Sequence, residues 1–311
     1  MRVGISNSEV HEWENCQTAW LYKYHPGSLL AKKSFGPART RGTIAHSSLE
    51  EFYAAIKREV PYKDAVEIAM DVIYRERMKA QQMSDGEKMQ MLRRLDDIMA
   101  KYYVHYKDDV DNWEIISTEN FHAMQAEPED DFYLPMRLDM VIYQRKGQYA
   151  GEISPIDHKT TNDWWSLVMF KLNSQLPLYI RALKENSFPG HPRPVVGRGI
   201  FNFIRTRDMK DPYPAELFQR RFVKPSPARI ENVYQNHLKI ARTIAPLKVM
   251  PLEDARKQVT LNLGTNSCKF CDYSQICMST IEDDDPSFTI AADYEPSTYG
   301  YAPLEMLDGG Q

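Results

Sequence analysis

The sequence contains no long apolar run and no large excess of charge of either sign. None of its apolar stretches approaches the ~20 residues of a membrane-spanning helix, so we expect no membrane segment. Residues 1–4 lack the charged-then-apolar pattern of a secretion signal, which predicts a cytoplasmic protein. An apolar fraction of 42% and a charged fraction of 26% are those of an ordinary globular chain.

Basic residues are missing from the end of the chain. No Lys or Arg follows Lys269, whereas eight acidic residues follow residue 278. The net charge is therefore +4 over residues 1–278 and −4 over the whole chain. A mildly basic body is compatible with nucleic-acid binding. We expect residues 279–311 to form an acidic, disordered tail that keeps the protein in solution or recruits a protein partner.

Cysteine is scarce as well, with only four in the chain. Cys268, Cys271 and Cys277 follow a C-x₂-C-x₅-C spacing, and Cys16 completes a set of four thiolates. In a cytosolic protein such close spacing favours a metal over disulfides. Four thiolates fit a [4Fe–4S] cluster or a tetrahedral zinc ion, and the chemistry alone does not choose between them. Either would join the two ends of the chain, which favours a single domain over residues 1–278.

The stretch 136–161 carries the pattern with most chemical content. Two runs rich in β-branched residues flank a polar turn that contains glycine, and this predicts a β-hairpin. The first run carries Asp139, and the second carries Asp157, His158 and Lys159. Because side chains alternate along a strand, Asp157 and Lys159 share one face and His158 points away. Two carboxylates beside a lysine suit a hard divalent cation, Mg²⁺ or Mn²⁺, and a water.

Helical patterns precede the hairpin. A first helix is expected over residues 6–24, with Ser6 or Ser8 as its N-cap. A second is expected from an N-cap at Thr43 to about residue 58, and it places His46 and Glu50 on one face. Two polar-rich helices with a break at residues 84–86 are expected between residues 61 and 111, as a helical insert.

Further elements are expected after the hairpin. An amphipathic helix over about residues 167–184 places Gln175 and Tyr179 four apart on one face, and Pro177 within it indicates a kink or a late start. A strand is expected over residues 195–205. Nine basic residues interleaved with aromatics lie between residues 193 and 229, and we expect them to contact DNA phosphates and bases. They are Arg193, Arg198, Arg205, Arg207, Lys210, Arg220, Arg221, Lys224 and Arg229.

Taken in order, these elements resemble the PD-(D/E)XK nuclease superfamily, and within it the Cas4/RecB-nuclease-like branch that bears an iron–sulfur cluster. The resemblance covers about residues 5–278 and departs from the pattern at Gln17, where the branch often has proline, and at Met136, where it often has glycine. The elements that carry it are Cys16, His46 and Glu50 as H-x-x-L-E, Asp139, Asp157-x-Lys159, Gln175 and Tyr179 as Q-x-x-x-Y, and the three terminal cysteines.

The resemblance implies an α/β fold with a restriction-endonuclease-like core, in which helices flank a central mixed β-sheet. It implies a Mg²⁺- or Mn²⁺-dependent deoxyribonuclease in the cytosol of a bacterium, an archaeon or a phage-infected host. We expect an exonuclease that acts on single-stranded DNA or DNA ends in recombination, repair or processing. The alternative is a catalytically silent DNA-binding or adaptor protein with a structural iron–sulfur or zinc site.

The resemblance also implies a role for each site residue. The metal ligands are expected to be His46, Asp139, Asp157 and the backbone carbonyl of His158, with Glu50 supporting His46. Lys159 is expected to orient the attacking water or stabilise developing charge, and Gln175 and Tyr179 to contact DNA or support Lys159. Cys16, Cys268, Cys271 and Cys277 are expected to hold the [4Fe–4S] cluster, with zinc as the alternative. Glu152 lacks the spacing to a lysine and receives no role.

Overall fold

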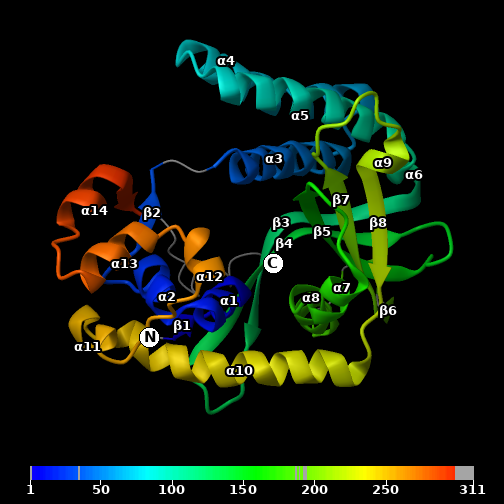
Figure 1. Cartoon of the computed structure of the whole chain (residues 1–311). Helices are drawn as coiled ribbons and strands as arrows, with labels where there is room; N and C mark the ends of the chain where they lie inside the picture. Colours follow the sequence, from blue (N-terminus) through cyan, green and yellow to red (C-terminus); the bar gives the residue numbers. More distant parts are fainter. Residues whose placement is uncertain (1, 34–35, 186–187, 189, 192–194, 298–311) are drawn as a thin grey trace. The chain divides into compact units, whose positions relative to one another are not determined.

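The computed structural model describes residues 2–297 except 34–35, 186–187, 189 and 192–194 (Figure 1). The chain divides into two compact units. Unit 1 comprises Met1–Phe35, His122–Met136 and Tyr234–Gln311, and unit 2 comprises Gly36–Phe121 and Arg137–Val233. Each unit is assembled from segments distant in the sequence. The expected single nuclease domain over residues 1–278 stays a prediction.

Unit 2 contains the helical insert and most of the strands. Its helices are α3 (Pro37–Lys57), α4 (Tyr62–Gln82), α5 (Gly86–His105), α6 (Asp109–Asn112), α7 (Leu167–Leu172), α8 (Gln175–Lys184) and α9 (Pro214–Leu217). Its strands are β5 (Glu152–Thr161), β6 (Val195–Val196), β7 (Gly199–Arg205) and β8 (Phe218–Val223), with most of β3 (Trp113–Gln125) and β4 (Phe132–Gln144).

Unit 1 contains the two ends of the described chain. Its helices are α1 (Asn7–Asn15), α2 (Gln17–Tyr24), α11 (Leu252–Arg256), α12 (Thr265–Lys269), α13 (Ser274–Ile281) and α14 (Ser287–Asp293), with most of α10 (Pro227–Val249). Its strands are β1 (Val3–Gly4), β2 (Leu30–Lys32) and β9 (Tyr294–Pro296). Ser6, one of the two predicted N-caps, caps α1 and forms a capping box with Glu9.

A mixed sheet organises the strands. Its order is β1-β4-β5-β7-β8, with β3 beside β4 and β6 beside β5. The β4–β5 and β7–β8 pairs are antiparallel, and β5 and β7 are parallel. The connection between β4 and β5 contains Gly147 and Gly151 at φ +89° and +90°, a left-handed conformation that glycine adopts without strain. The predicted hairpin is therefore confirmed.

Helices lie on both faces of the unit 2 sheet (Figure 1). The buried apolar residues of α3, α4 and α5 form one core with those of β4, β5 and β7. Helix α8 lies against the other face of β5 and β7, so closely that a Cβ on Gly199 would come within 2.8 Å of Leu176. This α/β architecture, a mixed sheet flanked by helices, confirms the predicted restriction-endonuclease-like fold class. The predicted helical insert is also present, as α4 and α5.

Several predicted boundaries are wrong. The expected helix over residues 6–24 is broken at Cys16, which has an extended backbone (φ −163°, ψ 116°). Helix α3 begins at Pro37 behind the N-cap Gly36, so Thr43 is an interior residue that bonds back to the carbonyl of Arg39. Residues 167–184 form two helices, and Pro177 is accommodated because it lies in the first turn of α8. The strand expected over residues 195–205 is divided into β6 and β7.

The expectation of disorder from residue 279 is wrong for the described part of that segment. Helix α14 and strand β9 lie there, and β9 pairs antiparallel with β2. Tyr294 is 3% exposed and stacks on Tyr273 with 5.8 Å between ring centroids. The acidic run at residues 282–285 suggested disorder, but the aromatic residue beyond it supplies the apolar burial that orders the segment. Residues 298–311 lie outside the described residues.

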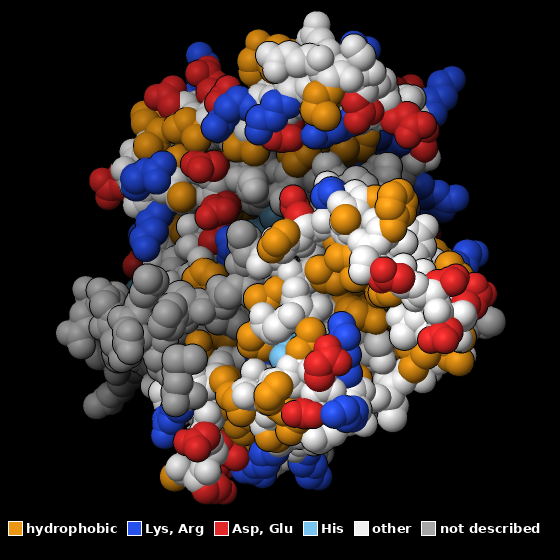
Figure 2. Space-filling model, turned by 90° about the vertical axis from the view of Figure 1, so that its left-hand side faces the viewer, with side chains coloured by type: hydrophobic (Ala, Val, Ile, Leu, Met, Phe, Trp, Pro, Cys, Tyr) orange, Lys and Arg blue, Asp and Glu red, His pale blue; other side chains and the backbone are white. Residues whose placement is uncertain are grey.

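Charge is mixed on the described part of one face of the molecule. The face drawn in Figure 2 intersperses Lys and Arg with Asp and Glu, as expected for a chain with 39 basic and 43 acidic residues. Among the described residues, no helix is both long and apolar enough to cross a bilayer.

Candidate active site

Strands β4 and β5 bring the predicted carboxylates together. Their paired register runs from Tyr143–Ile153 to Met140–Ile156. Next to this register, the Asp139 side chain links the two strands, because its Oδ2 accepts a hydrogen bond from the backbone N–H of His158 at 2.7 Å. The two strands thus meet at the point where the sequence places one acid on each.

The side chain of Lys159 lies against the carboxylate of Asp157, on the face of β5 opposite the side chain of His158. Its Nζ is 2.9 Å from Asp157 Oδ1 and 2.7 Å from Asp157 Oδ2. Burial alone would lower the pKa of Lys159, but the charge of Asp157 and the hydrogen bond to it outweigh burial, and the pKa is raised. Lys159 is therefore a cation in this arrangement. It is suited to stabilise negative charge rather than to accept a proton.

Helix α8 supports the lysine through a chain of hydrogen bonds. Lys159 donates to Gln175 Oε1 at 3.1 Å, and Gln175 Nε2 donates to the Tyr179 hydroxyl at 2.7 Å. The hydroxyl donates in turn to the backbone carbonyl of Arg137 at 2.7 Å. The spacing of four residues places Gln175 and Tyr179 on one helical face. The Q-x-x-x-Y pair thus connects Lys159 to strand β4.

Helix α3 brings His46 to the first carboxylate. Its Nδ1 lies 3.5 Å from Asp139 Oδ2. The approach of helix and strand is close, because a Cβ on Gly42 would lie 3.1 Å from Thr160 Oγ1. Burial lowers the pKa of His46, against the opposing effects of Asp157 and a hydrogen bond to the backbone of His158. A neutral imidazole is the form that coordinates a metal ion.

Glu119 on β3 is a site residue that the sequence analysis missed. With His46 and Asp139 it forms a group whose ligand atoms all lie within 4.8 Å of one another. Its backbone has φ +46°, an uncommon left-handed conformation for a residue with a side chain. Its carboxylate also pairs with Arg137. No motif or spacing in the sequence marks Glu119.

The acids of the site raise one another's pKa. Burial first and the charge of Asp157 second raise the pKa of Asp139 to about 7. Burial and the charge of Asp139 raise the pKa of Glu119 to about 7 as well. Like charges held this close in a poorly solvated place favour proton uptake unless a cation balances them.

The donor set fits a divalent cation. The side chain of Asp157 is 1% exposed, and its Oδ2 is buried without a hydrogen bond, although it forms an ion pair with Lys159. Carboxylate oxygens with one imidazole suit Mg²⁺ or Mn²⁺. The structure therefore collects His46, Asp139, Asp157, Lys159, Gln175 and Tyr179 in one place within unit 2 and adds Glu119.

His158 reaches this place through its main chain. Its side chain points to the other face of β5, as the strand alternation predicts, and its Nδ1 lies 2.7 Å from Asn202 Nδ2. The ring is 4% exposed, and burial holds the pKa of His158 well below its usual value. The backbone N–H of His158 bonds to Asp139, and its ring lies edge-on to that of His46, with 5.9 Å between the ring centroids.

The four cysteines line a single cavity of about 610 Å³ in unit 1. Cys16 lies at the break between α1 and α2, Cys268 in α12 and Cys277 in α13. Burial first, and the neighbouring thiols after it, raise the pKa of Cys277 to about 12. Among the described residues, no three of these thiols satisfy the 4.8 Å mutual spacing that the His46 group meets.

Several residues of the predicted DNA-binding stretch have partners within the protein. Arg198 bonds to both carboxylate oxygens of Glu152 at 2.7 and 3.2 Å. Arg205 and Arg207 pair with Asp163. Arg220 is buried, with a side chain 11% exposed, so it is not available to a DNA phosphate, and that expectation is wrong. Arg193 lies outside the described residues.

Comparison with known proteins adds the family. No curated protein matches the chain. A crystal structure of SSO0001 shares 12% identity, covering 65% of this chain and 79% of that chain, with a TM-score of 0.31. One of LHK-Exo in complex with dAMP shares 13% identity, covering 69% and 95%, with a TM-score of 0.27. The model of the PD-(D/E)XK nuclease superfamily matches residues 4–278. With nearly the whole described chain matched, this protein belongs to the PD-(D/E)XK nuclease superfamily.

Proposed function

We propose that the protein is a Mg²⁺- or Mn²⁺-dependent deoxyribonuclease. The observation that carries the proposal is the convergence of His46, Glu119 and Asp139 within 4.8 Å, beside Asp157 and its ion pair with Lys159. The cation would be held by His46, Asp139, Asp157 and the backbone carbonyl of His158, with Glu119 as a further carboxylate. When bound, it would lower the pKa of a water and neutralise charge on the phosphate.

The protein side chains would supply position and charge. Lys159, kept protonated by Asp157, would stabilise the negative charge that develops on the phosphate. Gln175 and Tyr179 would hold the ammonium in place through their hydrogen bonds to it and to strand β4. His46 would remain neutral, because burial lowers its pKa. Glu50 is expected to support His46. Burial raises the pKa of Glu50 and the charge of Arg137 opposes this effect, while the charge of Glu50 contributes to the raised pKa of Glu119.

The proposed substrate is DNA, as single strands or ends, with exonucleolytic action in recombination, repair or processing in the cytoplasm. Superfamily membership supports a nuclease in general, and the finer statement rests on the resemblance of the sequence. The acidic segment after residue 278 would recruit a protein partner. The exonucleolytic action is tested by the pattern of products from DNA with and without ends.

A [4Fe–4S] cluster is proposed for the four cysteines. All four line the same cavity. A tetrahedral zinc ion with Zn–S bonds of ~2.3 Å would need its four sulfurs about 3.8 Å apart, whereas among the described residues no three of these thiols lie within 4.8 Å of one another. The cluster would join α2 to the segment that carries α12 and α13 within unit 1. A structural role follows from this placement, with zinc as the alternative.

The test is a time course on end-labelled linear and on circular DNA with Mn²⁺. The wild type is expected to shorten the linear substrate and to leave the circle intact. Asp157→Ala and Lys159→Ala should abolish cleavage while DNA binding and folding persist. Glu152→Gln, on the same strand, is the control and should cut as the wild type does. Wild-type protein that binds DNA and never cuts it would favour the silent DNA-binding alternative. An iron and sulfide assay decides between cluster and zinc.

A further inference from the structure

A second polar cluster lies on the face of β5 opposite Asp157 and Lys159. The strand register pairs His158 with Asn202 on β7, and Asn202 with Arg220 on β8. Residues paired on adjacent strands project from the same face of a sheet. The three polar side chains therefore form one row across three strands. His158 and Asn202 are buried, with 4% and 0% of their surface exposed, and the Arg220 side chain is 11% exposed.

Hydrogen bonds along this row allow the side-chain amide of Asn202 only one orientation. Arg220 Nε donates to Asn202 Oδ1 at 3.2 Å. Because a guanidinium only donates, Oδ1 is the acceptor and the amide nitrogen faces the other way. That nitrogen lies 2.7 Å from His158 Nδ1 and 2.9 Å from the Tyr102 hydroxyl. Nδ1 of His158 must therefore accept, and the neutral ring carries its proton on Nε2.

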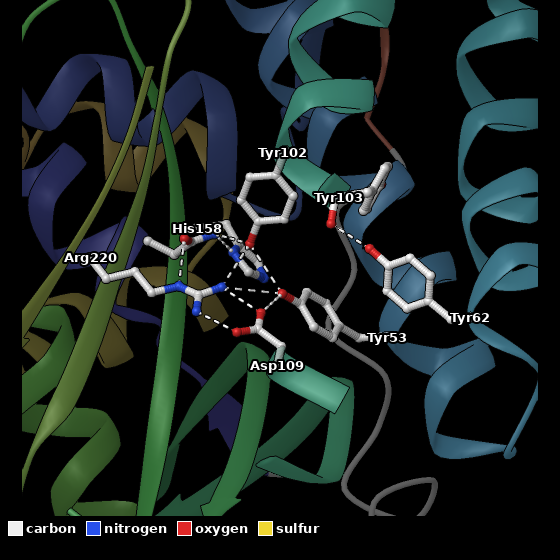
Figure 3. Close-up of polar contacts among 8 residues, drawn as sticks. Tyr53, Tyr62, Tyr102, Tyr103, Asp109, His158 and Arg220 are labelled. Carbon is white, nitrogen blue, oxygen red and sulfur yellow. Dashed lines mark hydrogen bonds and ion pairs between the residues drawn. The ribbon is translucent and has the colours of Figure 1, made fainter. Parts of the chain in front are cut away.

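The helical insert holds the far end of the row. Both terminal nitrogens of the Arg220 guanidinium, Nη1 and Nη2, donate to the carboxylate of Asp109 at 2.6 Å, and Tyr53 donates to the same carboxylate at 2.7 Å. Figure 3 shows Arg220, Asp109, Tyr53 and Tyr102 converging beside His158. The guanidinium also stacks on Tyr106, with Cζ 3.5 Å from the ring centroid. Residues of α3, α5 and α6 thus fix the position of Arg220.

His158, at the other end of this row, contacts two residues of the proposed metal site. The ring of His158 lies between that of Tyr53, stacked at 6.1 Å, and that of His46, edge-on at 5.9 Å. The backbone N–H of the same residue bonds to Asp139. A displacement of the ring would move two proposed ligands, His46 by contact and Asp139 by its hydrogen bond.

The ion pair in this row is hard to explain by stability alone. Burying an arginine and an aspartate costs desolvation that their attraction often only offsets, and apolar residues of similar size frequently serve as well. What an apolar replacement would lose is direction, because only the guanidinium fixes the amide that orients the imidazole. We propose that Arg220 is a positioning residue that, through Asn202 and His158, sets the geometry of the divalent-cation site. This inference rests on the proposed function.

Two variants test the proposal, and the second of them leaves no lone buried charge. Asn202→Asp keeps the shape and the partner of Arg220 but presents an acceptor instead of a donor to His158. Arg220→Met combined with Asp109→Leu removes both members of the ion pair together. The matched control is Arg198→Met combined with Glu152→Leu. It removes another bidentate pair attached to β5, at 2.7 and 3.2 Å, which lies outside the row.

The measurement is calorimetric titration of the metal-free, full-length protein with Mn²⁺, followed by DNA cleavage kinetics. Thermal melting monitored by circular dichroism reports whether each variant folds cooperatively. Both row variants are expected to bind Mn²⁺ about 10-fold more weakly, the lower end of the range for partners of metal ligands. Their kcat should fall while the KM for DNA stays as in the wild type. The control should bind Mn²⁺ as the wild type does.

The outcomes separate the inference from the function on which it rests. Folded row variants with wild-type Mn²⁺ affinity would overturn the role of Arg220, and so would a control that loses as much affinity as they do. A wild type that neither binds Mn²⁺ nor cuts DNA would instead refute the proposed nuclease. Weaker Mn²⁺ binding confined to the row variants supports the positioning role.

Discussion

Replacing Glu119 by Gln is expected to make the metal-free protein more stable while it weakens Mn²⁺ binding. Burial and the charge of Asp139 raise the pKa of Glu119 from 4.5 to about 7. A carboxyl with a raised pKa binds more protons in the folded than in the unfolded state between these two values. The folded state therefore loses stability as the pH rises from about 4.5 through 7, and the full cost is present at pH 8.

The size of the effect follows from the same values. The difference between 4.5 and about 7 corresponds to about 3 kcal/mol at 1.36 kcal/mol per pH unit. The value of about 7 already includes the lowering effect of Arg137 on the pKa of Glu119, and that side chain is 56% exposed, so its ion pair contributes little. Gln has the shape of a protonated Glu, so Glu119→Gln should raise the free energy of unfolding by up to about 3 kcal/mol at pH 8 and leave it nearly unchanged at pH 4.

Urea unfolding in EDTA at pH 4 and pH 8 measures this difference, and a Mn²⁺ titration at pH 8 measures the loss of the ligand. Glu152→Gln is the matched control. Its carboxylate accepts two hydrogen bonds from Arg198, so that variant should be less stable than the wild type at pH 8. The reasoning is refuted if Glu119→Gln is destabilised at pH 8, or if its stability differs from the wild type equally at both pH values.

Three further changes test other parts of the site. Gln175→Ala removes one of the two acceptors of Lys159 and leaves Asp157, and it should lower kcat about 10- to 100-fold with Mn²⁺ affinity unchanged in calorimetry. Gly42→Val should push α3 from β5, since even a Cβ would lie 3.1 Å from Thr160 Oγ1, and weaken Mn²⁺ binding about 10-fold. Cys271→Ser should lose iron, visible absorbance and thermal stability together; a colourless, iron-free wild type would contradict the cluster.

The parts of the site that the sequence predicts are those with a local period. Alternation along β5 separates Asp157 and Lys159 from His158, and a spacing of four aligns Gln175 with Tyr179. These relations need only the geometry of one strand or one helix. The fold class follows in the same way, because two strands joined by a glycine-containing turn and flanked by amphipathic helices specify an α/β arrangement.

The parts that the sequence does not predict depend on pairing between distant segments. Glu119 enters the site from β3 through a left-handed backbone conformation, which no pattern of residue types indicates. Arg220 stands among basic residues that suggested DNA binding, yet the pairing of β8 with β7 turns it inward toward Asp109. Charge counted along the chain does not distinguish an arginine that meets solvent from one that meets a buried aspartate.

Strand β5 carries both kinds of residue: those that a local period predicts and those whose partners come from distant segments. One face carries Asp157 and Lys159, which are suited to the chemistry, and the other carries His158, whose partners lie in the sheet and in helix α3. The two faces are coupled through the backbone of β5, because the backbone N–H of His158 bonds to the carboxylate of Asp139. A substitution on the buried face would therefore alter the metal site without touching a proposed ligand. His158, the residue between the acid and the lysine of the D-x-K motif, therefore connects the buried polar row to the proposed metal site, although the motif allows any residue at that position.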